Sequence, residues 1–245
     1  MTTININANT TVHTVHKKPT NSLQKIHALI MIMIKNMLMS PMIALGFITP
    51  PIMGFILNGY GDGGVFSFVV LSNILFAGTN TLLLMLVDEK EKNTLNVLIA
   101  SSVSALDYLL SGTIITMIIT TVINIVLFFT MGMNAHLSLL PFIALTTVPI
   151  LPSAAIGGII GILCNKATTA SMIAMPVFLG LVLIPQLATG SFELLNYLFA
   201  GQVTEGIAAI YLNESILPNI GIMMLNFCVL ASVFVILFKK RGLVQ

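Results

Sequence analysis

Residues 65–92 read VFSFVVLSNILFAGTNTLLLMLVDEKEK, a long apolar run followed directly by a cluster of charged residues. A helix needs about 20 consecutive, mainly apolar residues to cross the hydrocarbon core of a bilayer. The stretch from 65 to 87 meets that requirement and therefore predicts a membrane-spanning helix. The charged cluster at 88–92 predicts the point at which this helix leaves the bilayer.

The composition of the whole chain extends this prediction. Of its 245 residues, 57% are hydrophobic and only 7% are charged, whereas an ordinary soluble domain has about 25% charged residues. So few charges cannot cover the surface of a soluble protein of this size. The apolar runs are long enough for helices rather than barrel strands, so we expect an all-α integral membrane protein.

Polar breaks divide the chain into a tail and one transmembrane domain. Residues 1–21 are rich in Asn and Thr, which is typical of a disordered tail. In the domain 22–245, the stretch 22–38 has a helical apolar pattern beside Lys25 and Lys35, and we expect an N-terminal interfacial helix there. The apolar runs predict six spans, at about 41–57, 65–87, 109–131, 139–163, 170–188 and 217–238.

The placement of Lys and Arg predicts the orientation of these spans. If the N-terminus is cytoplasmic, all 10 basic residues fall on the cytoplasmic side, as the positive-inside rule requires. The opposite orientation would put every one of them outside. We therefore expect a multi-pass protein of the plasma membrane with both termini in the cytoplasm.

Residues 89–112 read EKEKNTLNVLIASSVSALDYLLSG and carry the clearest functional signal. Leu95, Leu98, Ile99, Val103 and Leu106 share one helical face, and acids near the start suit the helix dipole. The pattern predicts a short amphipathic helix at 91–107 on the cytoplasmic side. This helix is either a connector on the membrane surface or a coupling helix that binds a soluble partner.

The same segment resembles the intracellular segment of type-2 ABC exporter permeases, which reads roughly E-[KR]-E-x-G-T-L-E-x-L-L-x-[ST]-P-[VL]-S-x-x-E-[YIL]-[LI]-x-G-K. The order of apolar runs resembles that family over nearly the whole chain. Asn93, Asn96, Ser102, Asp107 and Thr113 depart from the pattern. The matching residues are Glu89, Lys90, Glu91, Thr94, Leu95, Leu98, Ile99, Ser101, Val103, Ser104, Tyr108, Leu109 and Gly112.

The resemblance implies the transmembrane subunit of an ABC exporter. Two such halves would pair, as a homodimer or with a sister permease, and each would bind an ATP-binding subunit that holds ATP and Mg. Residues 189–216 would form external re-entrant helices, near 192–199 and 203–212. The residues implied to couple to the ATPase are Glu89, Glu91, Thr94, Leu95, Leu98, Ile99 and Val103.

The sequence contains no G-x-x-x-x-G-K-[ST] phosphate loop. We therefore expect no ATPase or other enzyme activity and no cofactor on this chain itself.

Glycines and asparagines inside the apolar runs have their own interpretations. The glycines in 157–161 predict close helix packing. Asn73, Asn80 and Asn124 either line a transport pathway or form hydrogen bonds between helices. Asn73 and Asn80 are seven residues apart, which places them on one helix face.

Several functions remain open at this stage. The leading hypothesis is a bacterial exporter of an amphipathic or hydrophobic substrate such as a peptide toxin or bacteriocin, with a drug or lipid as the next choice. A channel-like or ion-driven transporter usually needs a charged group within a span, and the sequence has none well inside one. A third hypothesis is an immunity or sensor subunit that holds an ATPase or captures a peptide without transport. We expect no metal site and no nucleic-acid partner.

Overall fold

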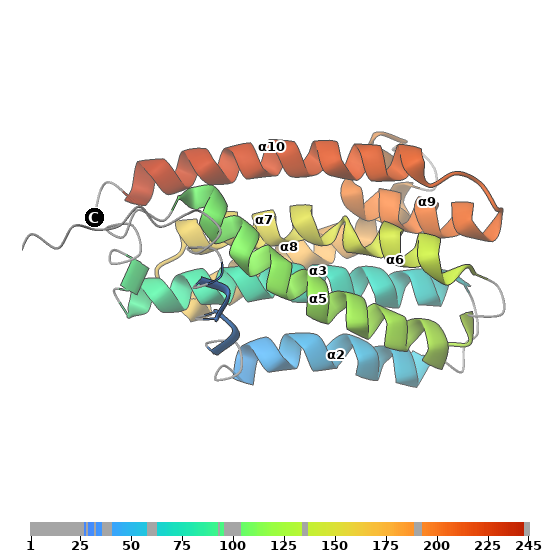
Figure 1. Cartoon of the computed structure of the whole chain (residues 1–245), viewed down its shortest axis with the longest axis horizontal. Helices are drawn as coiled ribbons and strands as arrows, with labels where there is room; N and C mark the ends of the chain where they lie inside the picture. The colour runs from blue at the N-terminus through green and yellow to red at the C-terminus, as the bar shows by residue number, and fades with distance from the viewer. Residues whose placement is uncertain are drawn as a thin grey trace, which may run out of the picture.

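The computed structural model describes residues 27, 29–31, 33–35, 41–57, 63–92, 94–95, 104–133, 137–188 and 193–242. These residues are helical, with short turns and without strands. Long helices that follow one another run in opposite directions along one bundle (Figure 1). The elements are α2 (Pro41–Leu57), α3 (Gly63–Glu91), α5 (Ala105–Thr130), α6 (Leu139–Thr147), α7 (Ile150–Leu163), α8 (Ala167–Ala188), η3 (Glu193–Tyr197), α9 (Phe199–Tyr211) and α10 (Leu217–Gly242).

Four helical stretches in the described residues are long and apolar enough to cross a membrane. They are Gly64–Glu91, Ala105–Thr130, Leu139–Leu163 and Leu217–Lys240. Two shorter apolar helices, Leu45–Leu57 and Ala167–Leu183, lie alongside them. This is the architecture of an all-α membrane protein, as the composition predicted.

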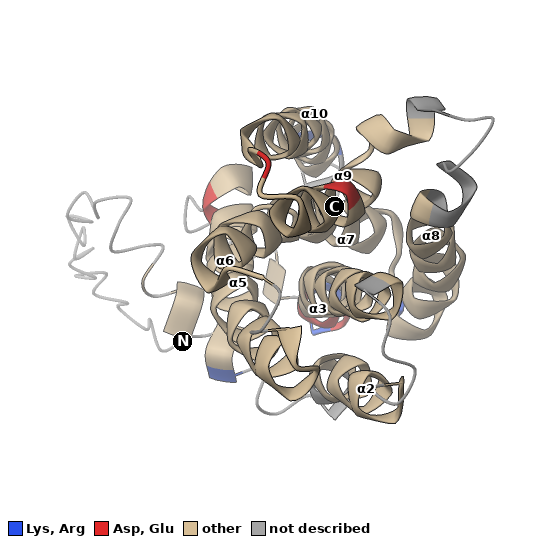
Figure 2. Ribbon diagram, turned by 90° about the vertical axis from the view of Figure 1, so that its right-hand side faces the viewer, with Lys and Arg blue, Asp and Glu red and all other residues tan. Residues whose placement is uncertain are grey.

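Helix α3 lies at the centre of the bundle, in contact with α2, α5, α7 and α8 (Figure 2). Its contact with α7 is close because Gly78, Gly157 and Gly161 have no Cβ at the interface. A Cβ at Gly157 would overlap the carbonyl oxygen of Thr79. Small residues of this kind let two helix backbones approach within a membrane. The close helix packing predicted at 157–161 is therefore confirmed.

The apolar run 139–163 consists of two helices, α6 and α7, joined at Val148 and Pro149. Proline has no amide hydrogen, so Pro149 cannot donate to the carbonyl one turn earlier. The Leu151 amide also departs from the regular α-helical pattern, because it donates to the Val148 carbonyl, only three residues back, at 3.1 Å. The regular hydrogen-bond ladder is interrupted at this point, which periodicity alone did not reveal.

The amphipathic helix predicted at 91–107 differs at both ends from the structure. Glu91 is the last residue of α3, and α5 already begins at Ala105. A capping box, which marks the start of a helix, fixes that beginning. Ser104 Oγ accepts from the Asp107 amide at 3.1 Å, and Asp107 Oδ2 accepts from the Ser104 amide at 3.2 Å. Thr94 and Leu95 are helical, whereas 93 and 96–103 lie outside the described residues.

The other predicted segments lie partly within the described residues. The tail 1–21 lies outside them, and the predicted interfacial helix 22–38 is helical at 27, 29–31 and 33–35. The stretch 189–216 contains two short helices, η3 and α9. They pack against α8 and α10, between which they lie in the chain.

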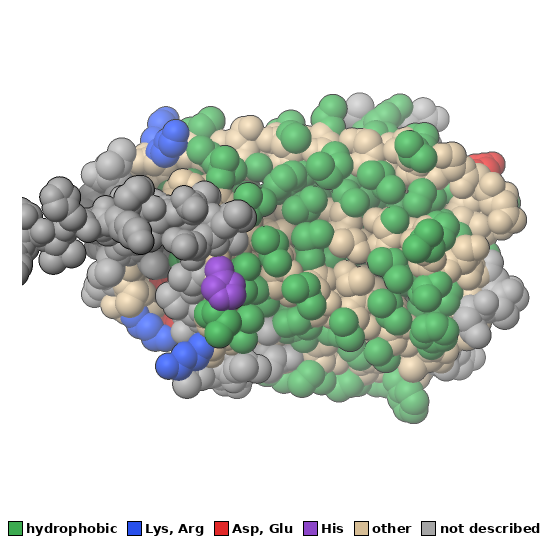
Figure 3. All heavy atoms as spheres, in the orientation of Figure 1, with side chains coloured by type: hydrophobic (Ala, Val, Ile, Leu, Met, Phe, Trp, Pro, Cys, Tyr) green, Lys and Arg blue, Asp and Glu red, His purple; other side chains and the backbone are tan. Residues whose placement is uncertain are grey.

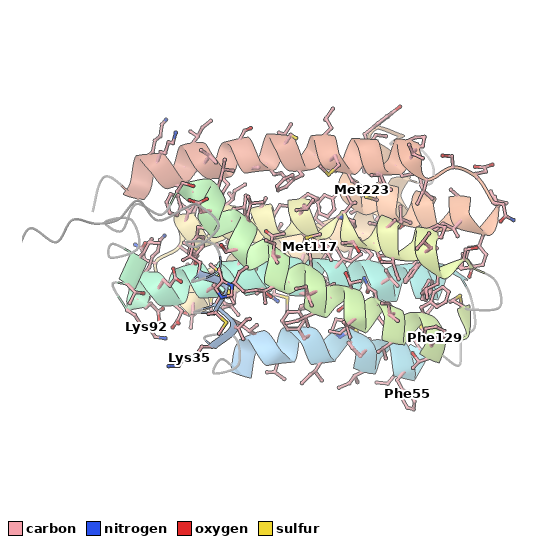
Figure 4. All side chains as sticks on the ribbon, in the orientation of Figure 1. Lys35, Phe55, Lys92, Met117, Phe129 and Met223 are labelled. Atoms are coloured by element: carbon pink, nitrogen blue, oxygen red, sulfur yellow. The ribbon has the colours of Figure 1, made fainter. Side chains whose placement is uncertain are left out.

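On the face that Figure 3 shows, the charged side chains lie towards the two ends of the bundle, and apolar side chains are spread over the surface between them. The lysines that the structure describes lie at the end where α3 and α10 finish, which we call the lysine-bearing end. Figure 4 shows Lys35 and Lys92 there, and Phe55 and Phe129 near the opposite end. Glu205 lies on α9 and Glu214 just after it, and α9 is in the opposite half of the bundle (Figure 1).

Candidate functional site at the lysine-bearing end

The charged cluster that ends α3 sends its side chains in different directions. Asp88 and Lys92, one helical turn apart, form an ion pair of 2.6 Å. Both side chains are largely exposed to solvent, so this pair contributes little to stability. Lys90 and Glu91 point instead to the turn between α7 and α8, and Glu89 is buried. The side chains of a single helical turn thus lie in solvent, at the α7–α8 turn and in the protein interior.

The Lys90 side chain caps the C-terminal end of α7. Its Nζ donates to the carbonyl oxygens of Gly161 at 2.9 Å, Ile162 at 2.5 Å and Cys164 at 3.0 Å. The last carbonyls of a helix have no partner within the helix and carry partial negative charge. A lysine ammonium has three donors, so its charge and its hydrogen bonds both match this helix end.

The Glu91 side chain caps the N-terminal end of α8. Its Oε1 accepts from the backbone amide of Ala167, the first residue of α8, at 2.9 Å. The first amides of a helix lack partners and carry partial positive charge, which a carboxylate offsets. Two consecutive residues of α3 therefore hold both helix ends that meet at the α7–α8 turn.

Glu89 lies inside the protein beside Tyr108 of α5. It is 3% exposed and Tyr108 is fully buried. Among the described residues, Glu89 Oε2 and the Tyr108 hydroxyl have no hydrogen-bond partner. The Tyr108 ring packs against Phe238 of α10 with the ring centroids 6.2 Å apart. A buried carboxyl group is costly without full pairing, so burial of Glu89 beside Tyr108 lowers the stability of this part of the bundle.

The residues predicted to couple to an ATPase have different locations. Glu91 and Thr94 are exposed, whereas Glu89 and Leu95 are buried. Thr94 Oγ1 donates to the carbonyl of Glu89 at 3.1 Å, which ties the segment after α3 to the helix end. Leu98, Ile99 and Val103 lie outside the described residues.

The three asparagines predicted for the membrane interior occupy two places. Asn73 Nδ2 donates to Asn124 Oδ1 of α5 at 2.7 Å, and the carbonyl of Thr120 lies 3.5 Å from it. Both asparagines are almost fully buried, and Asn73 Oδ1, Asn124 Nδ2 and Thr120 Oγ1 have no partner among the described residues. This pair connects α3 to α5.

Asn80 lies in a groove between α2 and α8, although it shares a helix face with Asn73. The described walls of this groove come from α2, α3 and α8, whereas Asn73 faces α5. The groove has a volume of about 170 Å³ and is mainly apolar. Its walls include Leu45 of α2, Phe76, Thr79 and Asn80 of α3, and Ser171 and Met175 of α8.

A second polar network lies at the opposite end, in the stretch where re-entrant helices were expected. Gln202 Nε2 donates to the Asn196 carbonyl at 2.6 Å and to Glu205 Oε2 at 3.0 Å, and Gln202 Oε1 accepts from Asn219 of α10 at 3.0 Å. This network holds η3, α9 and α10 together. Burial raises the pKa of the Tyr211 hydroxyl nearby, which donates to Met133 Sδ.

These polar sites do not resemble a metal centre. In the described parts of the chain, no three His, Cys, Asp or Glu side chains come together as a possible ligand set.

The motif at the end of α3 was visible in the sequence. The contacts of Lys90 and Glu91 with the α7–α8 turn were not, because more than 70 residues separate the partners.

Comparison with known proteins leaves the family open. No protein-family model matches the chain, and no curated protein matches it. A functional assignment therefore depends on the residues themselves and on where the fold places them.

Proposed function

We propose that this chain is the membrane-spanning permease subunit of an ATP-driven exporter. One observation carries the proposal: the 89–112 motif begins in the last turn of the central helix α3 and extends into the start of α5 at the lysine-bearing end. A soluble ATPase that binds there would act directly on the most buried of the four long apolar helices that the structure describes. The chain itself would be no enzyme, since ATP and Mg would be bound by the partner.

The proposed topology has six spans with both termini in the cytoplasm. The lysine-bearing end would face the cytoplasm by the positive-inside rule. α2 has 17 residues and α8 has 22, which correspond to roughly 26 and 33 Å of helix. Those lengths fit the range for a transmembrane helix, so α2 and α8 would complete the six. On this topology η3 and α9 would be the external re-entrant helices.

The groove between α2, α3 and α8 is the proposed start of the transport pathway. It is open at its side, and a second copy or a sister permease would close it. Asn80 would line this pathway, whereas Asn73 and Asn124 use their amides to join helices. The mainly apolar walls suit an amphipathic or hydrophobic substrate, such as a peptide toxin or bacteriocin, with a drug or lipid as the next choice. The host would be a bacterium and the location its plasma membrane.

Co-purification tests this function. The chain, tagged and co-expressed with the ATPase encoded beside it, should retain that ATPase in lipid nanodiscs and show vanadate-sensitive ATP hydrolysis. Leu98→Asp should abolish retention while insertion remains normal, because a charge would disrupt the apolar face of the coupling segment. Leu212→Asp, on an exposed leucine at the opposite end, is the matched control. Retention of the ATPase by the Leu98→Asp variant would contradict the coupling role.

One observation favours an ion-driven transporter as a second candidate. Glu89 is a buried carboxyl group with an unpartnered oxygen among the described residues, and such groups often carry protons or ions in transporters. Proteoliposomes without any ATPase distinguish the two functions. A proton flux that depends on an imposed pH gradient and disappears in Glu89→Gln would favour this candidate over the exporter subunit.

A further inference from the structure

The turn between α7 and α8 is short, and α3 holds it from both sides. α7 ends at Leu163 and α8 begins at Ala167. Lys90 binds the carbonyls at the end of α7, and Glu91 binds the amide at the start of α8. A cation therefore meets the negative end of one helix, and an anion meets the positive end of the next. We call this arrangement the turn clamp.

Beyond the turn clamp, α3 and α7 are also in close contact along the rest of their length. Gly78 and Gly157 bring the two backbones together in the middle of the bundle. Ser153 Oγ of α7 donates to the carbonyl of Ile74 at 3.1 Å and lies 3.1 Å from the Thr79 hydroxyl. Close packing and hydrogen bonds at several levels make α3 and α7 one mechanical unit.

Helix α8 is hydrogen-bonded to this unit at its first residue, and it also packs on α3 further along, where the Phe76 and Phe178 ring centroids lie 3.9 Å apart. Beyond the turn clamp, α8 forms one wall of the groove through Ser171 and Met175. The opposite wall is α2, and the floor is α3. A displacement of the end of α3 would therefore pull on the start of α8 and change the width of the groove.

We propose that Lys90 and Glu91 are positioning residues that transmit movement from the segment after α3 to the α8 wall of the groove. The proposal rests on the proposed function, because it needs a partner that moves this segment. It assigns the two charges an inward role, on the α7–α8 turn, rather than a role in contact with the partner. Lys92 is two residues away, and among the described residues its side chain pairs with Asp88, one turn back on its own helix.

Hydrogen exchange of the full chain in nanodiscs tests the clamp without any ATPase. In the wild type, the hydrogen-bonded amides within 164–170, those of Cys164, Ala167 and Ala170, should exchange slowly. Lys90→Met should speed their exchange roughly tenfold or more, because charge-assisted hydrogen bonds at two helix ends are lost or weakened. Lys90→Arg should restore slow exchange, and Lys92→Met is the matched control that should leave it unchanged. Equal exchange in wild type and Lys90→Met would overturn the proposal.

The second measurement uses the complex with the ATPase, before and after trapping with ATP, Mg and vanadate. In the wild type, trapping should change exchange at both 94–104 and 164–170. In Lys90→Met, only 94–104 should respond. A response of 164–170 that is the same in both proteins would overturn transmission through Lys90. If Lys90→Met does not insert, Glu91→Ala takes its place, with Glu91→Gln, which keeps an acceptor oxygen, as the rescue.

The two measurements separate the clamp from the proposed function. If the wild type retains no ATPase, the exporter proposal fails, while exchange in the chain alone still reports the clamp. If the ATPase is retained and 94–104 responds to trapping, the exporter proposal stands, and 164–170 alone decides the transmission role.

Discussion

Helices α3 and α10 are similar in length and both are apolar, yet they have opposite environments. α3 has 29 residues and α10 has 26. In α3, 89% of an 18-residue apolar stretch is buried within the chain, compared with 17% in α10. α3 lies at the centre of the bundle and α10 at its edge (Figures 1 and 2). In a soluble protein the more apolar helix would be expected inside. Here the more apolar helix, α10, is outside.

The difference reflects the solvent. Lipid tails are as apolar as leucine, so apolar side chains gain little by leaving lipid for the protein interior. Small and polar residues gain more, because they allow close backbones and hydrogen bonds between helices. α3 contains Gly78, Thr79 and Asn73 at its contacts, whereas α10 exposes Leu225, Val229 and other large apolar side chains. The comparison predicts how substitutions in the two interfaces will differ.

The largest effect is expected where α3 and α7 touch through glycine. Gly157→Leu would force a side chain into the backbone of Thr79 and should cost about 3 kcal/mol or prevent folding. Gly221→Leu on α10 has open space within 4 Å of the added Cβ and should leave folding unchanged. Size-exclusion profiles and melting temperatures of fluorescent-protein fusions measure both. Similar profiles for the two variants would contradict the α3–α7 contact.

Truncation of a leucine should have the next largest effect. Leu82 of α3 is fully buried and fills the space beside Gly112 and Gly158. Leu82→Ala should lower the free energy of unfolding by about 2–4 kcal/mol, because it leaves a cavity. Leu225 of α10 is 66% exposed, and lipid fills the space after Leu225→Ala, so that loss should be below about 0.5 kcal/mol. Reversible unfolding in mixed micelles compares the two, and a larger loss for Leu225→Ala would mean that another chain covers α10.

The buried asparagine pair should show a moderate and non-additive effect. Asn73→Leu leaves Asn124 Oδ1 without its donor, at a cost of about 1–2 kcal/mol in the free energy of unfolding. The double variant Asn73→Leu/Asn124→Leu should lose less free energy of unfolding than the sum of the two single losses, by about 0.5–1.5 kcal/mol. Strict additivity in this double-mutant cycle would show that the hydrogen bond contributes nothing.

These contrasts show which parts of the structure the sequence could predict. The all-α membrane class followed from composition and from the length of the apolar runs. The glycines at 157–161 were correctly interpreted as a close contact, since Gly has no other evident use in an apolar helix. The burial of α3 relative to α10 could not be read from hydropathy, because both exceed what a bilayer requires.

The candidate site was only partly visible in the sequence. The motif at 89–112 is contiguous, so its residues could be named. Asn73 and Asn80 share a face by their spacing, but the fold places one in a hydrogen bond to α5 and the other in a groove between α2 and α8. The roles of Lys90 and Glu91 depend on a turn far along the chain. Long-range geometry of this kind has no local pattern.

The smallest expected effect concerns single hydroxyl groups and gives the finest test of the comparison. Ser153 Oγ of α7 donates across the interface to the Ile74 carbonyl of α3, whereas among the described residues Ser232 Oγ of α10 donates to the Cys228 carbonyl on its own helix. Ser153→Ala should cost about 1 kcal/mol, and Ser232→Ala should stay within about 0.5 kcal/mol of the wild type. The same unfolding measurement resolves them. If the two losses were equal, polar contacts would not explain why α3 is inside, and close packing at the glycines alone would hold the centre of the bundle.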